Sequence, residues 1–438
     1  MKLICLLFIT LSVSIQAKSI KDFSPFDYEV LFTNPVCKTY YYDTPLETNA
    51  GDYVKAKTKN AYCKSSDSSR SQNRKNSPHK RMLEWINDSN TKEVFLSYLS
   101  FSKRSIAKAL CNGVKKRNLK VTFIIDSNNE SDDSRMATAN YLANCEAPDG
   151  TTPIVLTRGG EGRGRDKVGY AHNKIIIVNP NSKSDIRIGF GSGNMSSGIS
   201  THHENWHFIT TNAQTNFAQS QLCLMEGTIN HASSKSVYSA YISKCRALIK
   251  NPVEDDIKSF FVPGEGNEAM NAIAKEVSKS DSVKMAAHRF SNGKLIGIIG
   301  NHLKKGKTAK LVVDDDIYWT GVYKRGMGRN MYQEYSKVRT LQRAGMDVHY
   351  VETSANDIDE PTSLQLQHNK FLIFTNKNSG SVFTGAGNLT SSAFSTNFEN
   401  FYLISIPEVH TAFTTQYENM WNNLSKSYWD MPKEYQLP

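Results

Sequence analysis

The sequence predicts an α/β protein made of two similar lobes, each with a mixed or mostly parallel β-sheet flanked by helices. Three observations lead to this fold class. The chain has 438 residues, which at about 150 residues per domain allows two to three domains or one duplicated unit. Apolar runs with strand character alternate with segments whose apolar residues recur at helical spacing. This succession of segments occurs twice, which indicates an internal repeat.

The first 17 residues have the pattern of a signal peptide. One positive charge at Lys2 precedes an apolar run from Leu3 to Val13, and the small residue Ala17 offers a cleavage site. The apolar run is too short for a bilayer span, which needs about 20 residues. We therefore expect a secreted or periplasmic protein without a transmembrane segment.

The repeat sets the expected division of the chain. Its first copy opens with an apolar strand from Asp27 and its second with one from Ile257, and a helical stretch follows in each. An insertion rich in Ser, Lys and Asn occurs in the first copy only. The expected parts are a signal peptide at 1–17, a first lobe at 18–246 with the insertion at about 35–77, a polar linker at 247–256, a second lobe at 257–426 and a tail at 427–438.

The next elements of the two copies align without a gap. A second strand ends in a segment that pairs Phe101 with Phe290, and a helix with a Lys-rich end follows it. The strand after that helix ends in acidic residues, at Asp126 in the first copy and at Asp316 in the second. Strands and helices that alternate at this spacing indicate βαβ crossovers and parallel neighbours.

Each copy then carries the same polar motifs in the same order. His-Asn-Lys precedes four apolar residues, a Gly-rich turn with asparagine follows, and Glu-Asn-aromatic comes last. The motif residues are His172, Lys174, Asn194 and Glu204 in the first copy, and His368, Lys370, Asn388 and Glu399 in the second. A single His-x-Lys is weak evidence for a site, but two complete sets at nearly the same spacing favour a shared function.

These residue types suit phosphate chemistry. Residues i and i+2 of a strand point to the same face, so each histidine projects beside its lysine. An imidazole has an unperturbed pKa of about 6.5 and can act as nucleophile or proton donor, while lysine supplies positive charge for phosphoryl oxygens. The asparagine adds a neutral donor on a turn that can approach an oxyanion closely. The glutamate can hold an imidazole N–H and fix its tautomer.

With two His-x-Lys motifs, each followed by a Gly-x-Gly-Asn turn, the chain resembles the phospholipase D superfamily over nearly all of its mature length. The resemblance implies two pseudosymmetric lobes with one active site at their interface. There one histidine forms a covalent phosphohistidine and the other protonates the leaving oxygen. By family analogy His172 is the expected nucleophile and His368 the expected acid, although the sequence does not order them. The family's phosphate-binding positions correspond to Lys174, Lys370, Asn194 and Asn388, and no metal or other cofactor is implied.

One departure from the family pattern falls five residues after each lysine. Family members usually carry an aspartate there, and this chain has Asn179 and Thr375. In the family that aspartate looks structural, and the tyrosyl-DNA phosphodiesterase branch does without it. The departure weakens an assignment to the phospholipases proper.

The charge distribution bears on the substrate class. Lys and Arg number 53 against 42 Asp and Glu, and the net charge of +11 favours polyanionic partners such as nucleic acid or anionic lipid headgroups. A basic loop, Arg158–Lys167, precedes His172, whereas an acidic one, Glu352–Glu360, precedes His368. One basic and one acidic wall suit a zwitterionic headgroup better than a long nucleic acid strand.

We therefore expect an exported, monomeric phosphodiesterase that hydrolyses a phospholipid headgroup at a membrane surface. A metal-independent nuclease with the same chemistry is the closest alternative, supported by the net charge and the aspartate-free motifs. A phosphatidyl transferase and an inactive polyanion binder are further alternatives. His202, His203 and His207 surround Glu204 and suggest a metal, but strand alternation would divide them between two faces.

Six cysteines follow the predicted signal peptide, and none has CxxC spacing, so zinc binding through cysteine is not expected. An even number in an exported chain predicts three disulfides. Pairing of sequence neighbours is the simplest of fifteen connectivities, and free buried thiols are the alternative. The neighbouring pairs are Cys37 with Cys63, Cys111 with Cys145, and Cys223 with Cys245.

Overall fold

The computed structural model describes residues 19–34, 44–45, 56–57, 71–73, 77–162, 164–318, 329–351, 353, 366–377 and 379–431. The predicted signal peptide, most of the insertion, Arg163 and the acidic side chains of the loop before His368 lie outside these residues. No helix in the described part of the chain has the length and hydropathy that a membrane span requires.

The first sheet has seven strands in the order β1-β9-β8-β7-β4-β5-β6. Its strands are β1 (Asp27–Thr33), β4 (Glu93–Tyr98), β5 (Lys120–Asp126), β6 (Ile154–Arg158), β7 (Lys174–Val178), β8 (Asp185–Gly191) and β9 (Glu204–Asn212). The neighbours β4–β5 and β5–β6 are parallel, and the other neighbouring pairs are antiparallel. The sheet is therefore mixed, as the sequence predicts.

The second sheet repeats this order and adds one strand, in the order β10-β16-β15-β14-β11-β12-β13-β17. Its strands are β10 (Ile257–Val262), β11 (Ser282–Ala287), β12 (Thr308–Asp314), β13 (Asp347–Val351), β14 (Lys370–Thr375), β15 (Gly380–Gly385), β16 (Glu399–Ile404) and β17 (Ser425–Ser427). The parallel pairs, β11–β12 and β12–β13, occupy the same places as in the first sheet. A short separate pair joins β2 (Thr44–Pro45) to β3 (Ala56–Lys57).

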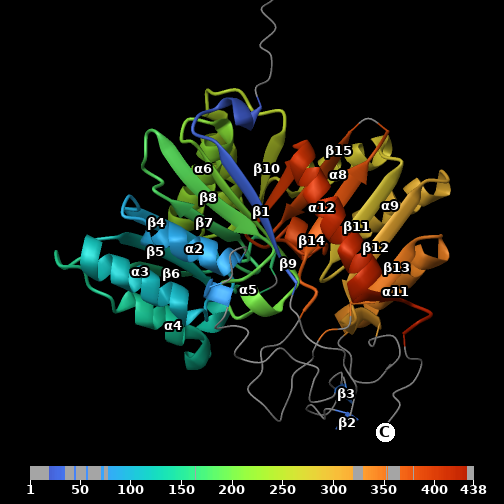
Figure 1. Ribbon diagram of the computed structural model, residues 1–438, viewed down its shortest axis with the longest axis horizontal. Coiled ribbons are helices and arrows are strands. Elements are labelled where there is room, and N and C mark those ends of the chain that lie inside the picture. Colours follow the sequence, from blue (N-terminus) through green and yellow to red (C-terminus); the bar gives the residue numbers. More distant parts are fainter. Residues whose placement is uncertain are drawn as a thin grey trace, which may run out of the picture.

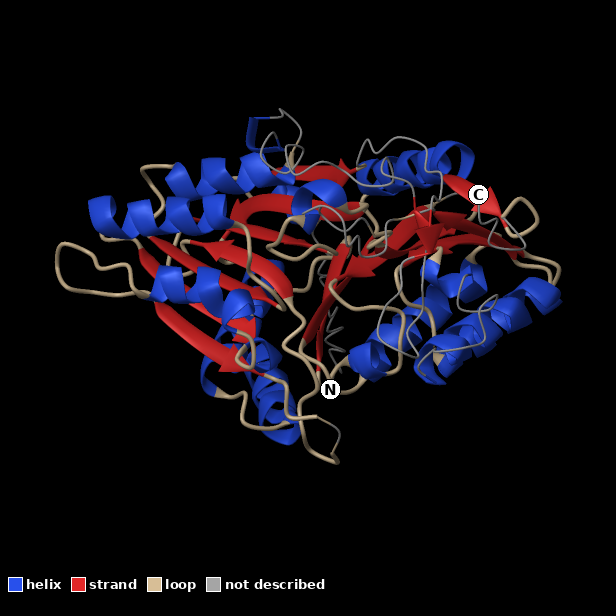
Figure 2. Cartoon of the chain, turned by 90° about the horizontal axis from the view of Figure 1, so that it is seen from below, coloured by secondary structure: helices blue, strands red, loops and turns tan. Residues whose placement is uncertain are grey.

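Helices cover both faces of the sheets (Figure 2). In the first lobe they are α2 (Pro78–Asn87), α3 (Arg104–Arg117), α4 (Asp133–Ala143), α5 (Gly198–Thr201), α6 (Asn216–Asn230) and α7 (Lys235–Ala247). In the second lobe they are α8 (Gly266–Lys279), α9 (Gly293–Lys304), α11 (Arg329–Arg343) and α12 (Pro407–Asn419). One apolar cluster lies in each lobe, and a third contains residues of both lobes.

Strand β7 shows why the sequence at the first motif is so apolar. Ile175 and Ile177 pack in the cluster shared by the two lobes, whereas Ile176 and Val178 pack in the cluster of the first lobe. Both faces of the strand are thus covered, and a continuous apolar run replaces the alternation of a half-exposed strand. The burial fixes the direction in which Lys174, at the start of β7, projects.

The two lobes lie side by side with β1 and α12 between them (Figure 1). Each lobe extends to the other lobe the helix that follows its Glu-Asn strand, since α6 contacts β10 and α12 contacts β1. The rings of Phe190 and Tyr402 stack across this junction with centroids 3.8 Å apart. Packing of aromatic rings at the junction holds the two lobes in a defined relative position.

The register of the sheets confirms one sequence alignment and corrects another. Phe101 bridges to the Gly-rich turn of its lobe, and Phe290 does the same in the second lobe. The alignment of the acidic strand ends needs correction. In the first sheet Ile125 pairs with Tyr98, and in the second sheet Val313 pairs with Ala287 at the equivalent place. The counterpart of Asp126 is therefore Asp314. The alignment with Asp316 was wrong because consecutive aspartates conceal the end of the strand.

Two of the three expected disulfides are present, Cys111–Cys145 and Cys223–Cys245. The first ties α3 to the end of α4, and the second joins α6 to α7. Cys37 and Cys63 lie outside the described residues, so their pairing stays a prediction.

Reduction of these two bridges should destabilise the first lobe. Each bridge restricts the conformations of the unfolded chain, and reduction removes that restriction. We therefore expect the free energy of unfolding to fall by about 2–4 kcal/mol per bridge. Urea unfolding with and without reductant measures the change, and mass spectrometry of unreduced peptides identifies the pairs. Four alkylatable thiols at these positions in the native, unreduced protein would contradict the pairing.

Candidate active site

Both His-Asn-Lys motifs lie where the two lobes meet. The segment before β7 forms a parallel bridge between Ala171 and Phe398, and the segment before β14 forms one between His203 and Gln367. The backbone N–H of His172 donates to the carbonyl of Phe398 at 3.0 Å, and that of His368 donates to the carbonyl of His203 at 3.0 Å. Each histidine backbone is thus held by the opposite lobe.

The side chains of the histidines also find their partners across the interface. His172 Nδ1 lies 2.8 Å from Glu399 Oε2, and His368 Nδ1 lies 3.0 Å from Glu204 Oε1. Both glutamates are fully buried, and both histidines nearly so. A carboxylate only accepts, so in the neutral ring Nδ1 carries the proton and Nε2 keeps the lone pair. In each of the two resulting His–Glu dyads, the glutamate therefore comes from the lobe opposite the histidine.

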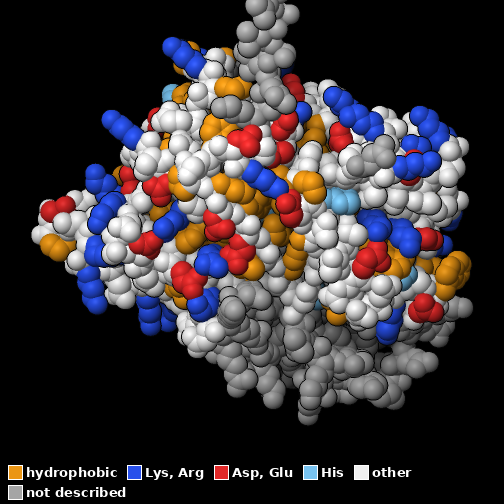
Figure 3. All heavy atoms as spheres, turned by 45° about the horizontal axis from the view of Figure 1, so that its top comes forward, with side chains coloured by type: hydrophobic (Ala, Val, Ile, Leu, Met, Phe, Trp, Pro, Cys, Tyr) orange, Lys and Arg blue, Asp and Glu red, His pale blue; other side chains and the backbone are white. Residues whose placement is uncertain are grey.

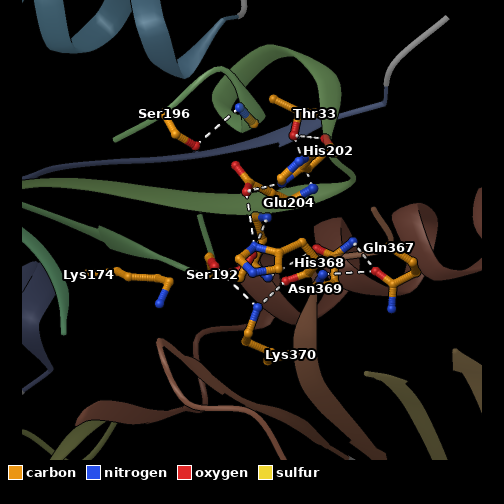
Figure 4. A network of polar contacts seen from close by, with 12 residues as sticks. Thr33, Lys174, Ser192, Ser196, His202, Glu204, Gln367, His368, Asn369 and Lys370 are labelled. Atoms are coloured by element: carbon orange, nitrogen blue, oxygen red, sulfur yellow. Dashed lines mark hydrogen bonds and ion pairs between the residues drawn. The ribbon is translucent and has the colours of Figure 1, made fainter. Parts of the chain in front are cut away.

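The lysines lie against these dyads. Lys174 Nζ is 3.1 Å from His172 Nε2. Lys370 Nζ donates to the carbonyls of His368 at 2.6 Å and of Ser192 at 3.3 Å (Figure 4). Burial lowers the pKa of Lys174 to about 8. Burial, followed by repulsion from Lys174, lowers the pKa of Lys370 well below its usual value. An anionic ligand between these ammonium groups would favour their charged forms.

Burial also lowers the pKa of both histidines. For His172 the desolvation is opposed by the negative charge of Glu399. For His368 it is reinforced by positive charge, chiefly from Lys370, and the pKa falls well below 6.5. Neutral imidazoles are therefore favoured in the free protein at neutral pH. A neutral ring offers the Nε2 lone pair that a nucleophile needs.

The Gly-rich turns approach this centre closely. Ser192, whose carbonyl accepts from Lys370, lies two residues before Asn194. A Cβ atom at Gly193 would overlap the carboxylate of Glu204, so only glycine fits there. The side chains of Asn194 and Asn388 are half-buried, and their Oδ1 atoms have no hydrogen-bond partner among the described residues. A ligand at this turn could supply the hydrogen bonds that these amides lack.

A family model described as the PLD-like domain of cardiolipin synthase matches residues 273–421, which hold the second His-x-Lys motif and its turn. The same motif set recurs around His172 in a lobe of the same strand order. Residues 273–421 therefore belong to the phospholipase D superfamily. The match supports an enzyme that acts on phosphodiester bonds.

One solved structure supports this fold, and two others are more distant. Phosphatidylserine synthase from Haemophilus influenzae has a TM-score of 0.52 and 14% identity, with 81% of this chain and 85% of that chain covered. Nuc from Salmonella typhimurium has a TM-score of 0.29 and 22% identity, with 39% and 97% covered. Yeast tyrosyl-DNA phosphodiesterase has a TM-score of 0.45 and 10% identity, with 74% and 86% covered. No protein of curated function matches the sequence.

Two aspartates hold the backbone just before the two His-Asn-Lys motifs. The sequence alone did not assign them this role. Asp126 Oδ2 accepts from the backbone N–H of Ala171 at 2.6 Å, and Asp314 Oδ2 accepts from that of Gln367 at 2.9 Å. Each contacted residue directly precedes a motif histidine. The twofold occurrence of acid at the strand end is the signal that points to them.

Asn205 and Asn400, which follow the two glutamates, also join the lobes. Asn205 Nδ2 donates to Asn369 Oδ1 at 3.1 Å, and Asn400 Oδ1 accepts from the backbone N–H of Lys174 at 2.9 Å. Both amides are fully buried. The repeated Glu-Asn pair therefore contacts the motif of the opposite lobe, where Asn205 meets the side chain of its central asparagine and Asn400 meets the backbone of its lysine.

Asn179 and Thr375, which stand where superfamily members usually carry an aspartate, make structural contacts. Asn179 Oδ1 accepts from the backbone N–H groups of Lys92 and Glu93 at 2.8 and 3.2 Å, which ties the end of β7 to the start of β4. Thr375 Oγ1 lies 3.1 Å from His410 Nε2. Neither position contacts the dyads through these bonds, which agrees with a structural role for the usual aspartate.

Part of the basic loop before His172 is also structural. Arg158 donates to the backbone carbonyls of Thr228 and Ile229, at 3.0 and 2.6 Å, near the end of α6. Arg165 and Lys167 are exposed. Only these two described cations of the loop are therefore open to an anionic ligand.

Two groups of described residues have the spacing of a metal site. In one, the carboxylates of Asp314 and Asp315 accept hydrogen bonds from Thr353, and that of Asp316 pairs with Arg289 at 3.6 Å. The other joins His202 to Glu204 and His368. His203 instead lies 3.4 Å from Asn34, and His207 stacks on Phe190, so the three clustered histidines do not converge.

The crossed dyads predict which histidine each glutamate serves. Changing Glu399 to Gln should impair His172, and changing Glu204 to Gln should impair His368, because the amide no longer fixes the Nδ1–H tautomer. We expect each change to lower kcat about 10- to 100-fold, the usual cost of losing such a supporting group. Nitrogen-15 NMR of the ring nitrogens reports the tautomer directly. A change confined to the histidine of the same lobe would contradict the crossing.

Proposed function

We propose that the protein hydrolyses a phosphodiester through a covalent phosphohistidine. The main support for this proposal is the pair of His–Glu dyads that are completed across the lobe interface. A buried lysine lies beside each dyad. Superfamily membership supports phosphodiester chemistry. A buried imidazole with a fixed Nδ1–H presents its Nε2 lone pair to phosphorus, and the lysines supply positive charge for the oxygens.

In the first step, His172 Nε2 attacks phosphorus. The N–P bond forms as the bond from phosphorus to the leaving oxygen breaks, and protonated His368 gives its proton to that oxygen. In the second step, His368 takes a proton from water, whose oxygen attacks phosphorus and breaks the N–P bond. Lys174, Lys370, Asn194 and Asn388 stabilise the non-bridging oxygens throughout. The arriving phosphate anion favours the protonated form of His368.

A phospholipid headgroup is the substrate class that we propose first. The matching family model is described as a PLD-like domain of cardiolipin synthase, and one neighbour that shares the fold over most of its length is a phosphatidylserine synthase. On the face shown in Figure 3, Lys and Arg side chains are distributed among Asp and Glu. Such a mixed surface suits a single headgroup better than a long polyanion.

One observation favours nucleic acid as a second candidate. A cavity of about 640 Å³ on the second lobe combines cationic and aromatic side chains. Arg339 lies 3.9 Å above the ring of Tyr428, Lys310 lies 4.7 Å above Trp421, and Trp429 is 72% exposed. Stacking rings beside cations are the recognition elements of single-stranded nucleic acids.

A substrate panel in excess EDTA tests both candidates. Phosphatidylcholine, phosphatidylglycerol, single-stranded DNA and duplex DNA are compared, with ethanol added to detect transfer in place of hydrolysis. We expect full activity on a phospholipid without added metal, since no step uses one. Activity on single-stranded DNA alone, weakened by changing Trp429 to Ala, would replace the lipid by the nucleic acid. A strict requirement for a divalent ion would contradict the phosphohistidine mechanism.

A further inference from the structure

The two dyads differ at the position two residues before each glutamate. In the second half this residue is Asn397, whose Nδ2 donates to Glu399 Oε1 at 3.0 Å. In the first half it is His202, whose Nδ1 lies 3.4 Å from Glu204 Oε1. The position that holds an amide in the second half thus holds an imidazole in the first half. An imidazole can bind a metal as well as form hydrogen bonds. The pseudosymmetry of the site is broken at this pair.

Three potential ligand atoms converge at Glu204. Its Oε1 is 3.0 Å from His368 Nδ1 and 3.4 Å from His202 Nδ1, and one ligand atom of each residue lies within 4.8 Å of the others. Tetrahedral zinc with bonds of about 2.0–2.1 Å holds its ligand atoms about 3.3 Å apart. Trp206 Nε1 donates to the other carboxylate oxygen at 3.2 Å, which leaves Oε1 to the two imidazoles.

We propose that His202, Glu204 and His368 form a zinc-binding site whose occupation switches the enzyme off. Two imidazoles and one carboxylate are a zinc ligand set, and the fourth position is left for water. All three side chains are largely buried, with the two imidazoles 12% and 8% exposed. Figure 4 shows His202 and His368 on the two sides of the Glu204 carboxylate.

The arrangement of the three side chains suits a cation. The carboxylate of Glu204 lies between the two imidazoles, with its Oε1 at 3.0 Å from His368 Nδ1 and 3.4 Å from His202 Nδ1. Neutral imidazole and carboxylate are the forms in which these groups bind a metal. The ammonium of Lys370 is engaged with the carbonyls of His368 and Ser192.

Zinc at Nδ1 of His368 would block the catalytic cycle. The ring proton would move to Nε2, so the ring would have no lone pair with which to take a proton from water, and metal coordination would prevent the doubly protonated form. Glu204 would also be withdrawn from its hydrogen bond. His172 would be spared, because Asn397 offers no comparable third ligand beside Glu399. The inhibitory effect rests on the proposed function, whereas metal binding itself does not.

A cobalt titration tests the site apart from activity. The full-length protein is stripped with EDTA and desalted, Co²⁺ is added, and the visible bands of tetrahedral cobalt are followed before displacement by Zn²⁺. We expect one equivalent to bind to the wild type. Changing His202 to Asn, the residue that the second half carries, should abolish the bands. Changing His231 to Asn is the matched control, because this histidine stacks on Tyr241 at the end of α6.

Inhibition is then measured on each variant relative to its own metal-free activity. We expect the Zn²⁺ concentration for half-inhibition to rise at least about tenfold for His202→Asn and to stay unchanged for His231→Asn. A second variant, His202→Gln, shows whether loss of the imidazole or a folding defect causes the change. Equal inhibition of wild type and both His202 variants, or absence of the cobalt bands in the wild type, would overturn the proposal. Stoichiometric cobalt binding through His202 in a protein without phosphodiesterase activity would overturn the proposed function alone.

Discussion

Replacing either His172 or His368 with asparagine should lower kcat by a factor of about 10² to 10⁴, the usual contribution of a positioned nucleophile, acid or base. Asparagine keeps a polar group near Nδ1 and can still meet the glutamate of the opposite lobe, so the interface should persist. It has no atom equivalent to Nε2, from which the attack and the proton transfer take place. Initial rates on the best substrate of the EDTA panel provide the measurement.

Acid quenching separates the two roles. Wild-type enzyme mixed with ³²P-labelled substrate should retain covalent label, the His172 variant should retain none, and the His368 variant should retain some if the leaving group departs without an acid. The His231 variant serves as the unaffected control. Label kept by the His172 variant and lost by the His368 variant would exchange the two assignments.

Replacing Lys174 or Lys370 with methionine should lower kcat by a factor of about 10² to 10³, as expected when one donor to a developing oxyanion is removed. Methionine preserves most of the buried hydrocarbon volume, so the change isolates the ammonium group. Both lysines are buried beside the dyads, where a charge interacts more strongly than in water. Steady-state kinetics with kcat and KM determined separately give the test.

A matched control is Lys284 to Met, since this lysine of the second lobe pairs with Glu418 away from the dyads. It should leave both kinetic constants unchanged. A raised KM with normal kcat in the Lys174 and Lys370 variants would mean that the ammonium groups bind substrate and transition state equally. That result would contradict their role in stabilising the reaction.

The sequence predicted the two-lobe α/β fold because its polar motifs and its strand pattern repeat in the same order. It left open whether each sheet is mixed or mostly parallel, and the structure has the mixed form. The crossover from β4 to β5 through α3 has the length of a parallel connection, but β7 and β8 follow one another through a short loop, which joins antiparallel strands. Strand β17, three residues long and polar, carries no apolar pattern by which it could be recognised.

The site could be predicted in its residue types but not in its pairing. Alternation along a strand places His172 and Lys174 on one face, yet it says nothing of the segment that lies opposite. Glu399 was expected to hold an imidazole, and only the bridge between Ala171 and Phe398 shows that this imidazole belongs to the other lobe. The contact of His202 with Glu204 was missed for a similar reason, because His202 precedes β9 and does not follow the strand alternation.

The exchange of glutamates between lobes means that neither half of the chain contains a complete dyad. Two identical halves could complete each other only as a symmetric dimer, and in such a dimer every substitution would appear in both dyads. Joining the halves in one polypeptide removes that constraint, because each half can then change alone. His202 and Asn397 are such a divergence. The covalent link thus permits two equivalent histidines to acquire different neighbours, and hence to specialise, within a single interface.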